Sequence, residues 1–217
     1  MKTKLQLALD DITWSDALRL TDKLQSSIDI VELGTPFIME YGMEAVRSFR
    51  KHFPDKELLC DGKIMDAGSY EAKLLYEAGA DYVTVLAVTD DRTVADVTAC
   101  AGEYGKKVVA DMICVSDLGL RTERMEALGV DIIAVHTGVD QQAAGRTPLD
   151  DLKTIRSCAK RAAVAVAGGI NAAAIGDYLE YRPEIVIVGS GIIHAKDPVK
   201  EAGKLARQIS RNQPYDF

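Results

Sequence analysis

Short apolar runs rich in Val and Ile recur along the whole chain, and they set the first expectation about its structure. Eight of them can be recognised, at residues 5–9, 28–33, 58–60 leading into Asp61, 82–86, 108–113, 132–135, 163–167 and 185–188. The runs are almost continuously apolar and do not alternate with polar positions. This pattern is typical of parallel strands that are covered on both faces. The sequence therefore predicts eight parallel β-strands.

A longer stretch with helical spacing follows each apolar run. These stretches cover residues 13–25, 43–52, 69–78, 95–104, 117–128, 148–161, 172–180 and 198–211. Ser, Thr or Asp stands at several of their starts and Gly just past several of their ends, which is the usual punctuation of helices. Gly79 and Gly129 each end a helix and lead directly into the next strand. We therefore predict that strands and helices alternate.

Eight βα units in 217 residues give about 27 residues per unit, which is compact but sufficient for a (β/α)8 TIM barrel. A doubly wound open sheet is the alternative architecture. It usually needs fewer strands, and the chain lacks an early Gly-x-Gly-x-x-Gly turn for a dinucleotide. Because no Pro-, Gly- or Ser-rich linker interrupts the pattern, we predict a single α/β barrel domain over residues 1–217.

Composition and charge narrow the possible partners. The chain has 26 Lys and Arg against 33 Asp and Glu, a net charge of −7, and no basic run, so nucleic acid is not expected as a partner. No apolar run approaches the roughly 18–20 residues of a membrane span, and the N-terminus has no signal-peptide pattern. Cys60, Cys100, Cys114 and Cys158 are widely spaced without a Cys-x-x-Cys pair. We therefore expect free thiols and a cytoplasmic location.

Polar residues stand at the ends of most of the predicted strands, where a barrel carries its reactive groups. They include Asp10, Glu32, Asp61 with Lys63, Asp111 and His136. Polar groups at so many strand ends on one rim exceed what packing alone requires. The sequence thus predicts a charged site at this rim.

The closest candidates for a metal site are Glu32 and Asp61. Asp61 and Lys63 are two residues apart, so on a strand both side chains point to one face, and Glu32 lies on the adjacent strand about 5 Å away. Two carboxylates at that distance repel by about 3 kcal/mol at an effective dielectric of 20. Either Lys63 or a divalent cation can offset this repulsion, and oxygen ligands suit Mg²⁺ or Mn²⁺. A self-satisfying Asp–Lys–Glu ion-pair network is the structural alternative.

Asp66 and His136 are two further candidates with competing interpretations. Asp66 follows in the pattern Asp61-x-Lys63-x-x-Asp66, although it could simply begin the next helix. His136 ends an apolar run and is followed by Thr137 and Gly138. A histidine at the barrel mouth is well placed for proton transfer, whereas a hydrogen-bonded structural histidine is the alternative.

Two glycine-rich turns follow the last two predicted strands. They contain Gly168 and Gly169 in the first turn, and Gly189, Ser190 and Gly191 in the second. Exposed backbone N–H groups and helix starts at this position form anion sites in barrels. Either turn alone is a weak signal because glycine often just permits a tight turn. Together they predict that the substrate carries a phosphate.

Five segments give the chain a specific resemblance to a known family. They are 6–10 (QLALD), 31–36 (VELGTP), 61–68 (DGKIMDAG), 136–145 (HTGVDQQAAG) and 167–170 (AGGI). Over almost its full length the chain resembles the 3-hexulose-6-phosphate synthases of the orotidine-monophosphate-decarboxylase-like group. The related 3-keto-L-gulonate 6-phosphate decarboxylases typically have arginines where this chain has Val139 and Ser190.

The resemblance implies a role for each site residue. Glu32 and Asp61 would hold Mg²⁺ (or Mn²⁺), Lys63 would stabilise enediolate charge, Asp10 would bind substrate hydroxyls and His136 would move protons. Asp66 would reach the active site of a partner subunit, which implies a homodimer with shared active sites. Gly169, Gly189 and Ser190, next to Gly168, would lie at the phosphate.

The resemblance also implies a lyase of one-carbon and carbohydrate metabolism. The expected reaction is the aldol addition of formaldehyde to D-ribulose 5-phosphate through a Mg-stabilised enediolate, giving D-arabino-hex-3-ulose 6-phosphate in the ribulose monophosphate pathway. The alternatives are a 3-keto-L-gulonate 6-phosphate decarboxylase, a non-catalytic phosphosugar-binding protein and an epimerase-like use of the same site.

Overall fold

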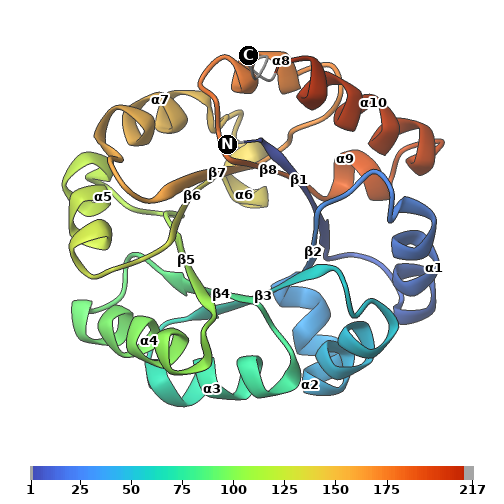
Figure 1. Cartoon of the computed structure of the whole chain (residues 1–217). Coiled ribbons are helices and arrows are strands. Elements are labelled where there is room, and N and C mark those ends of the chain that lie inside the picture. The colour runs from blue at the N-terminus through green and yellow to red at the C-terminus, as the bar shows by residue number, and fades with distance from the viewer. Residues whose placement is uncertain (1, 213–217) are drawn as a thin grey trace.

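Eight parallel strands close into a barrel in chain order, from β1 to β8 and back to β1 (Figure 1). The computed structural model describes residues 2–212. The strands are β1 Lys4–Leu9, β2 Ile30–Leu33, β3 Glu57–Ile64, β4 Tyr82–Leu86, β5 Lys107–Asp111, β6 Ile132–His136, β7 Ala163–Ala167 and β8 Ile185–Val188. The predicted (β/α)8 architecture is confirmed, and every predicted strand is present.

An outer ring of helices surrounds the barrel (Figure 1). The helices are α1 Trp14–Leu24, α2 Thr35–His52, α3 Gly68–Ala78, α4 Asp91–Tyr104, α5 Leu118–Ala127, α6 Val139–Ala143, α7 Leu149–Cys158, α8 Ile175–Leu179, α9 Ser190–Ile193 and α10 Pro198–Arg211. No helix within residues 2–212 is long and apolar enough to cross a lipid bilayer.

Some element boundaries differ from the sequence prediction. The predicted helix 43–52 forms the second part of α2, which begins at Thr35. Gly42 has a non-helical backbone (φ 63°, ψ −164°) that kinks α2. Because this kink interrupts the helical periodicity of the sequence, the first part of α2 was not predicted. The strand predicted at 58–60 continues to Ile64. The prediction was too short because the apolar run ends at polar residues that still belong to the strand. The short helices α6 and α9 were not predicted, since five and four residues are too few to show a helical period.

The core has two layers, because successive side chains of a strand point to opposite sides of the sheet. In β2, Ile30 belongs to the cluster inside the barrel, whereas Val31 packs in the layer between the barrel and the helices. Both side chains are at most 1% exposed. Burying an aliphatic side chain of this size stabilises a fold by about 1.5–3 kcal/mol. Because both faces of each strand are covered by one of these two layers, the strands are apolar on both faces, as the sequence predicted.

Acidic residues hold the strands together at the amino-terminal end of the barrel. An Asp or Glu stands just before each even-numbered strand and accepts a hydrogen bond from the backbone N–H of the second residue of the preceding strand. The pairs are Asp29 with Leu5 (2.8 Å), Asp81 with Leu58 (2.9 Å), Asp131 with Val108 (2.9 Å) and Glu184 with Val164 (2.7 Å). The same contact thus repeats four times around the barrel.

Candidate active site

The carboxyl-terminal ends of the strands surround a cavity of about 1210 Å³. Nine of the ten predicted site residues line it: Asp10, Glu32, Asp61, Lys63, His136, Gly168, Gly169, Gly189 and Ser190. They come from β2, β3, β6 and the segments that directly follow β1, β7 and β8. The barrel topology therefore brings together residues that are far apart in the sequence.

Asp66 does not line this cavity. It lies between β3 and α3, is exposed, and its carboxylate accepts a hydrogen bond from the backbone N–H of Ala67 at 2.8 Å. This contact lies just before α3, and Asp66 does not cap the first turn of that helix. A catalytic role for Asp66 within its own chain is not supported by this placement, and a role in a partner's site stays a prediction.

Lys63 and Asp61 form the centre of a charged network at the cavity. The Lys63 ammonium lies 3.1 Å from the Asp61 carboxylate and 2.7 Å from that of Asp111. Burial opposes a charged lysine, but the charges of Asp61 and Asp111 outweigh it and hold the pKa of Lys63 well above its ordinary value. Lys63 is therefore a permanent cation at the barrel mouth.

Two hydroxyl groups fix the Asp61 carboxylate from opposite neighbours. Thr84 on β4 donates to Asp61 Oδ1 at 2.7 Å, and the Thr35 hydroxyl at the start of α2 lies within hydrogen-bond distance of both Asp61 Oδ2 (2.9 Å) and the Asp61 backbone carbonyl oxygen (2.7 Å). Asp61 is itself only 6% exposed. Both carboxylate oxygens thus have donors, as the burial of an ionised group requires.

Asp111 links Lys63 to His136 and was noted in the sequence only as a strand end. Its carboxylate lies 2.9 Å from His136 Nδ1 and also accepts the Ile113 backbone N–H. Burial alone would raise the pKa of Asp111, but the contacts with His136 and Lys63 outweigh burial and lower it to about 2. An ionised Asp111 accepts a hydrogen bond from the Nδ1–H group, so the His136 tautomer assigned from this contact leaves Nε2 with a free lone pair.

Glu32 lies deep in the cavity without a cationic partner among the described residues. It is 8% exposed, and Gln6 Nε2 donates to its Oε2 at 2.6 Å. Burial, followed by the charges of Asp61 and Asp10, raises the pKa of Glu32 well above its usual range. Asp10 stays accessible to the solvent in the mouth, yet the surrounding protein and then Asp61 raise its pKa as well.

The donor set at this end of the barrel fits a divalent cation. Glu32 and Asp61 offer hard carboxylate oxygens whose mutual repulsion Lys63 does not fully compensate, because it pairs with Asp61 and Asp111. Within residues 2–212, no three acidic, His or Cys side chains are grouped as a ready-made metal cage. An ion held by Glu32 and Asp61 would therefore keep positions for other oxygens.

The two glycine turns border the same cavity. Gly168 and Gly169 have φ values of 126° and 68°, which residues with a side chain rarely adopt. A Cβ on Gly168 would lie 2.7 Å from the Thr137 carbonyl oxygen, so packing also requires glycine there. Gly189 lies against β1, where a Cβ would approach the Ala8 carbonyl oxygen at 3.3 Å. The turns keep the backbone bare at the cavity wall, as an anion site needs.

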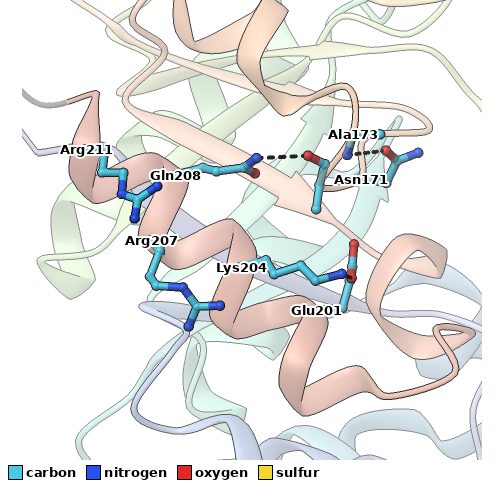
Figure 2. Close-up of a pocket in the computed structure, with 8 residues that line it drawn as sticks. Asn171, Ala173, Glu201, Lys204, Arg207, Gln208 and Arg211 are labelled. Atoms are coloured by element: carbon cyan, nitrogen blue, oxygen red, sulfur yellow. Dashed lines mark hydrogen bonds and ion pairs between the residues drawn. The ribbon is translucent and has the colours of Figure 1, made fainter.

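A second hollow of about 470 Å³ lies outside the barrel, between α10 and the loop after β7 (Figure 2). Two of its polar side chains have partners next to the hollow: Gln208 donates to the Ala172 carbonyl at 3.0 Å, and Lys204 pairs with Glu201 at 2.8 Å. None of the predicted site residues lines this hollow. The larger cavity at the strand ends is therefore the candidate site.

Comparisons with known proteins agree with this geometry. The model of the orotidine 5'-phosphate decarboxylase / HUMPS family matches residues 3–205. The 3-hexulose-6-phosphate synthase of Bacillus subtilis is 42% identical over 206 residues, covering 95% of this chain and 98% of that protein.

Solved structures extend the likeness. The 3-hexulose-6-phosphate synthase of Salmonella typhimurium has a TM-score of 0.95 and 49% identity, covering 97% of this chain and 100% of that one. The 3-keto-L-gulonate-6-phosphate decarboxylase of Vibrio cholerae has a TM-score of 0.85 and 26% identity, covering 99% and 100%.

The closed barrel and the charged network at its mouth define a (β/α)8-barrel enzyme. The chain belongs to the orotidine 5'-phosphate decarboxylase / HUMPS family, and the resemblance stated from the sequence is confirmed.

Proposed function

We propose that this protein catalyses the aldol addition of formaldehyde to D-ribulose 5-phosphate, giving D-arabino-hex-3-ulose 6-phosphate. The names of its relatives at 42% and 49% identity support this assignment. The observation that carries the mechanism is the chain of contacts from Lys63 through Asp111 to His136 at the barrel mouth. These contacts support a mechanism in which a cation and a proton acceptor act in one cavity.

His136 is the proposed base. Asp111 accepts a hydrogen bond from Nδ1, so Nε2 can remove the proton from C1 of the sugar phosphate. The resulting enediolate carbon attacks the formaldehyde carbon and forms the new C–C bond. The former carbonyl oxygen of formaldehyde then takes a proton from His136, which returns to its neutral form.

Lys63 is the proposed stabiliser of the negative charge that develops on the sugar oxygens. Its ion pairs with Asp61 and Asp111 position the ammonium before the reaction begins, which is the main source of electrostatic catalysis. The same pairs keep Lys63 protonated and therefore non-nucleophilic, which argues against a Schiff base. Borohydride trapping with substrate tests this: a covalent adduct on Lys63 would contradict the proposed role.

Glu32 and Asp61 are the proposed ligands of Mg²⁺ or Mn²⁺, which would act as a Lewis acid that makes the sugar's C1 proton easier to remove. Asp10 is proposed to bind substrate hydroxyls at the accessible part of the mouth. The glycine turns with Gly168, Gly169, Gly189 and Ser190 are proposed to bind the phosphate through backbone N–H groups.

We further propose a homodimer in which Asp66 reaches the site of the partner subunit. Large apolar side chains are exposed near Asp66, including Met65 (51%), Tyr70 (67%) and Leu74 (41%), and a second subunit would cover them. Mixing two inactive variants, Asp66→Ala and Lys63→Met, tests the shared site. Activity that returns in the mixture supports it, and a mixed dimer that stays inactive contradicts it.

A formaldehyde-consumption assay with D-ribulose 5-phosphate, with and without EDTA, tests the main proposal. We expect consumption that requires both the sugar phosphate and a divalent cation. No consumption in the presence of Mg²⁺ or Mn²⁺ would overturn the assignment. We also propose a cytoplasmic location, which the four free cysteines support.

Decarboxylation of 3-keto-L-gulonate 6-phosphate is the second candidate, because the structure is also similar to that of such a decarboxylase at 26% identity. Val139 and Ser190 both line the cavity. The sequence resemblance implies that the decarboxylases typically have arginines at these two positions. We therefore expect formaldehyde uptake to exceed CO₂ release when each substrate is supplied with Mg²⁺.

A further inference from the structure

A local irregularity in β3 carries the two central residues of the site. β3 pairs regularly with β4 at Cys60 and Val83, and again at Ile64 and Val85. Between these two pairs, the three residues 61–63 of β3 face the single residue Thr84 of β4. Bulges of this kind redirect side chains and leave backbone groups without their usual sheet partners. Asp61 and Lys63 both belong to this bulge.

The Thr84 hydroxyl contacts both ends of the bulge. It accepts a hydrogen bond from the Lys63 backbone N–H at 2.9 Å and donates to Asp61 Oδ1 at 2.7 Å. The direction of both bonds is fixed, because an amide N–H can only donate and an ionised carboxylate can only accept. Thr84 is only 5% exposed at the wall of the cavity.

Lys63 needs such a partner, because its backbone is in an unfavourable conformation. Its φ is 44°, in the left-handed region that favours glycine. Backbone of this kind persists only where surrounding contacts hold it, and it gathers at functional sites. Without the Thr84 hydroxyl, the Lys63 N–H would lose its described partner, and the left-handed backbone that places the Lys63 ammonium beside Asp61 and Asp111 would lose a contact that holds it.

We propose that Thr84 is a positioning residue that holds the bulged segment 61–63, so that the Asp61 carboxylate and the Lys63 ammonium meet at the cavity. This inference deepens the proposed function and rests on it for its kinetic part. Thr35 contacts Asp61 but makes no contact with Lys63 among the described hydrogen bonds, so it cannot replace Thr84 in this role.

Thr84→Val tests the proposal, because it removes the hydroxyl while keeping the shape of the side chain. We expect kcat to fall by about 10–100-fold while KM for D-ribulose 5-phosphate changes less than about threefold, as for other residues that orient reacting groups. Thr84→Ser keeps the hydroxyl and should restore most of kcat. Thr122→Val is the matched control: Thr122 is also buried, on α5, and its hydroxyl has no partner among the described residues.

Hydrogen–deuterium exchange gives a readout that does not depend on activity. In Thr84→Val the Lys63 amide should exchange faster, whereas Thr84→Ser and Thr122→Val should match the wild type. Wild-type kcat and exchange in Thr84→Val would overturn the proposal, and so would a Thr84→Ser variant that loses as much as Thr84→Val. If Thr84→Val does not fold, Thr84→Ala compared with Thr84→Ser is judged by the same criteria. A wild-type protein without activity would refute the proposed function, while the exchange experiment would still decide the role of Thr84.

Discussion

The two ends of the barrel use carboxylates in opposite ways. At the amino-terminal end, Asp29, Asp81, Asp131 and Glu184 each accept a backbone N–H from a neighbouring strand. At the carboxyl-terminal end, acidic side chains crowd around one cavity, and Glu32 has no cationic partner among the described residues. The first arrangement joins neighbouring strands. The second leaves a carboxylate, that of Glu32, available to bind a cation or a substrate.

The pKa shifts express this difference directly. Burial opposes ionisation of Asp81, but Lys106, the Leu58 backbone N–H and Arg50 outweigh it and lower its pKa. For Glu32, burial and nearby acidic groups act in the same direction and raise the pKa. The same chemical group therefore stabilises the fold at one end and is held at a cost at the other, as expected of residues kept for function.

The largest effect should come from His136→Gln, which removes the proposed base at the mouth. General-base catalysis contributes about 10²–10⁴-fold, so kcat for formaldehyde addition should fall by that factor. His52 on the exposed end of α2 offers the matched control, and His52→Gln should leave kcat unchanged. Steady-state kinetics measure both. A His136→Gln variant with nearly full activity would remove His136 from the mechanism.

Asp81→Asn tests the opposite end of the barrel, with the next largest effect. The carboxylate binds Lys106 at 2.7 Å, the Leu58 N–H at 2.9 Å and also Arg50. Hydrogen bonds to charged groups contribute about 1.5–3 kcal/mol, so the free energy of unfolding should fall by about that amount. Urea denaturation measures the loss, and kcat of the folded variant should match the wild type. A stable variant with reduced kcat would show that the two ends are not separate in function.

The sequence predicted the barrel well, because its eight apolar runs depend on burial that is the same in every βα unit. It also predicted which strand ends meet, since Glu32 and Asp61 lie on adjacent strands that run in the same direction. Thr84 escaped prediction because a threonine within a strand looks like an ordinary strand former. Its role depends on the bulge in β3 that brings it opposite Lys63. No local sequence pattern indicates where the register between β3 and β4 shifts.

Asp111 was underestimated for a different reason. It was seen at a strand end, but its importance comes from contacts with Lys63 and His136, which lie 48 and 25 positions away in the chain. Asp66 lies outside the cavity of its own chain, and its role in a partner's site stays a proposal. Distances between side chains on different strands are set only when the barrel has formed, so the sequence alone does not give them.

Glu32→Gln should separate activity from stability at the mouth. The glutamine keeps the size of the side chain and removes a buried charge that Asp61 and Asp10 repel. We expect the free energy of unfolding in EDTA at pH 7 to rise by roughly 0.5–2 kcal/mol, as for other substitutions that trade function for stability. Formaldehyde addition should fall, because the substitution removes one proposed ligand of the cation. Equal or lower stability would show that Glu32 is better compensated than its contacts indicate.

The smallest effects should appear in the pH dependence of these two stability differences, and their signs should be opposite. The folded-state pKa of Asp81 lies below its ordinary value of 3.8, so its stabilisation is fully present above that value and is lost as pH falls through the folded pKa. The difference in the free energy of unfolding between wild type and Asp81→Asn should therefore be constant from pH 5 to 7 and close in acid.

The folded-state pKa of Glu32 lies above 4.5, so wild-type stability should decline relative to Glu32→Gln as pH rises from 4.5 toward the folded pKa. Urea denaturation in EDTA between pH 3.5 and 8 measures both gaps. A Glu32→Gln gap that stays the same at every pH would mean that Glu32 titrates alike in the folded and unfolded states, and the contrast between the two ends would lose its electrostatic basis.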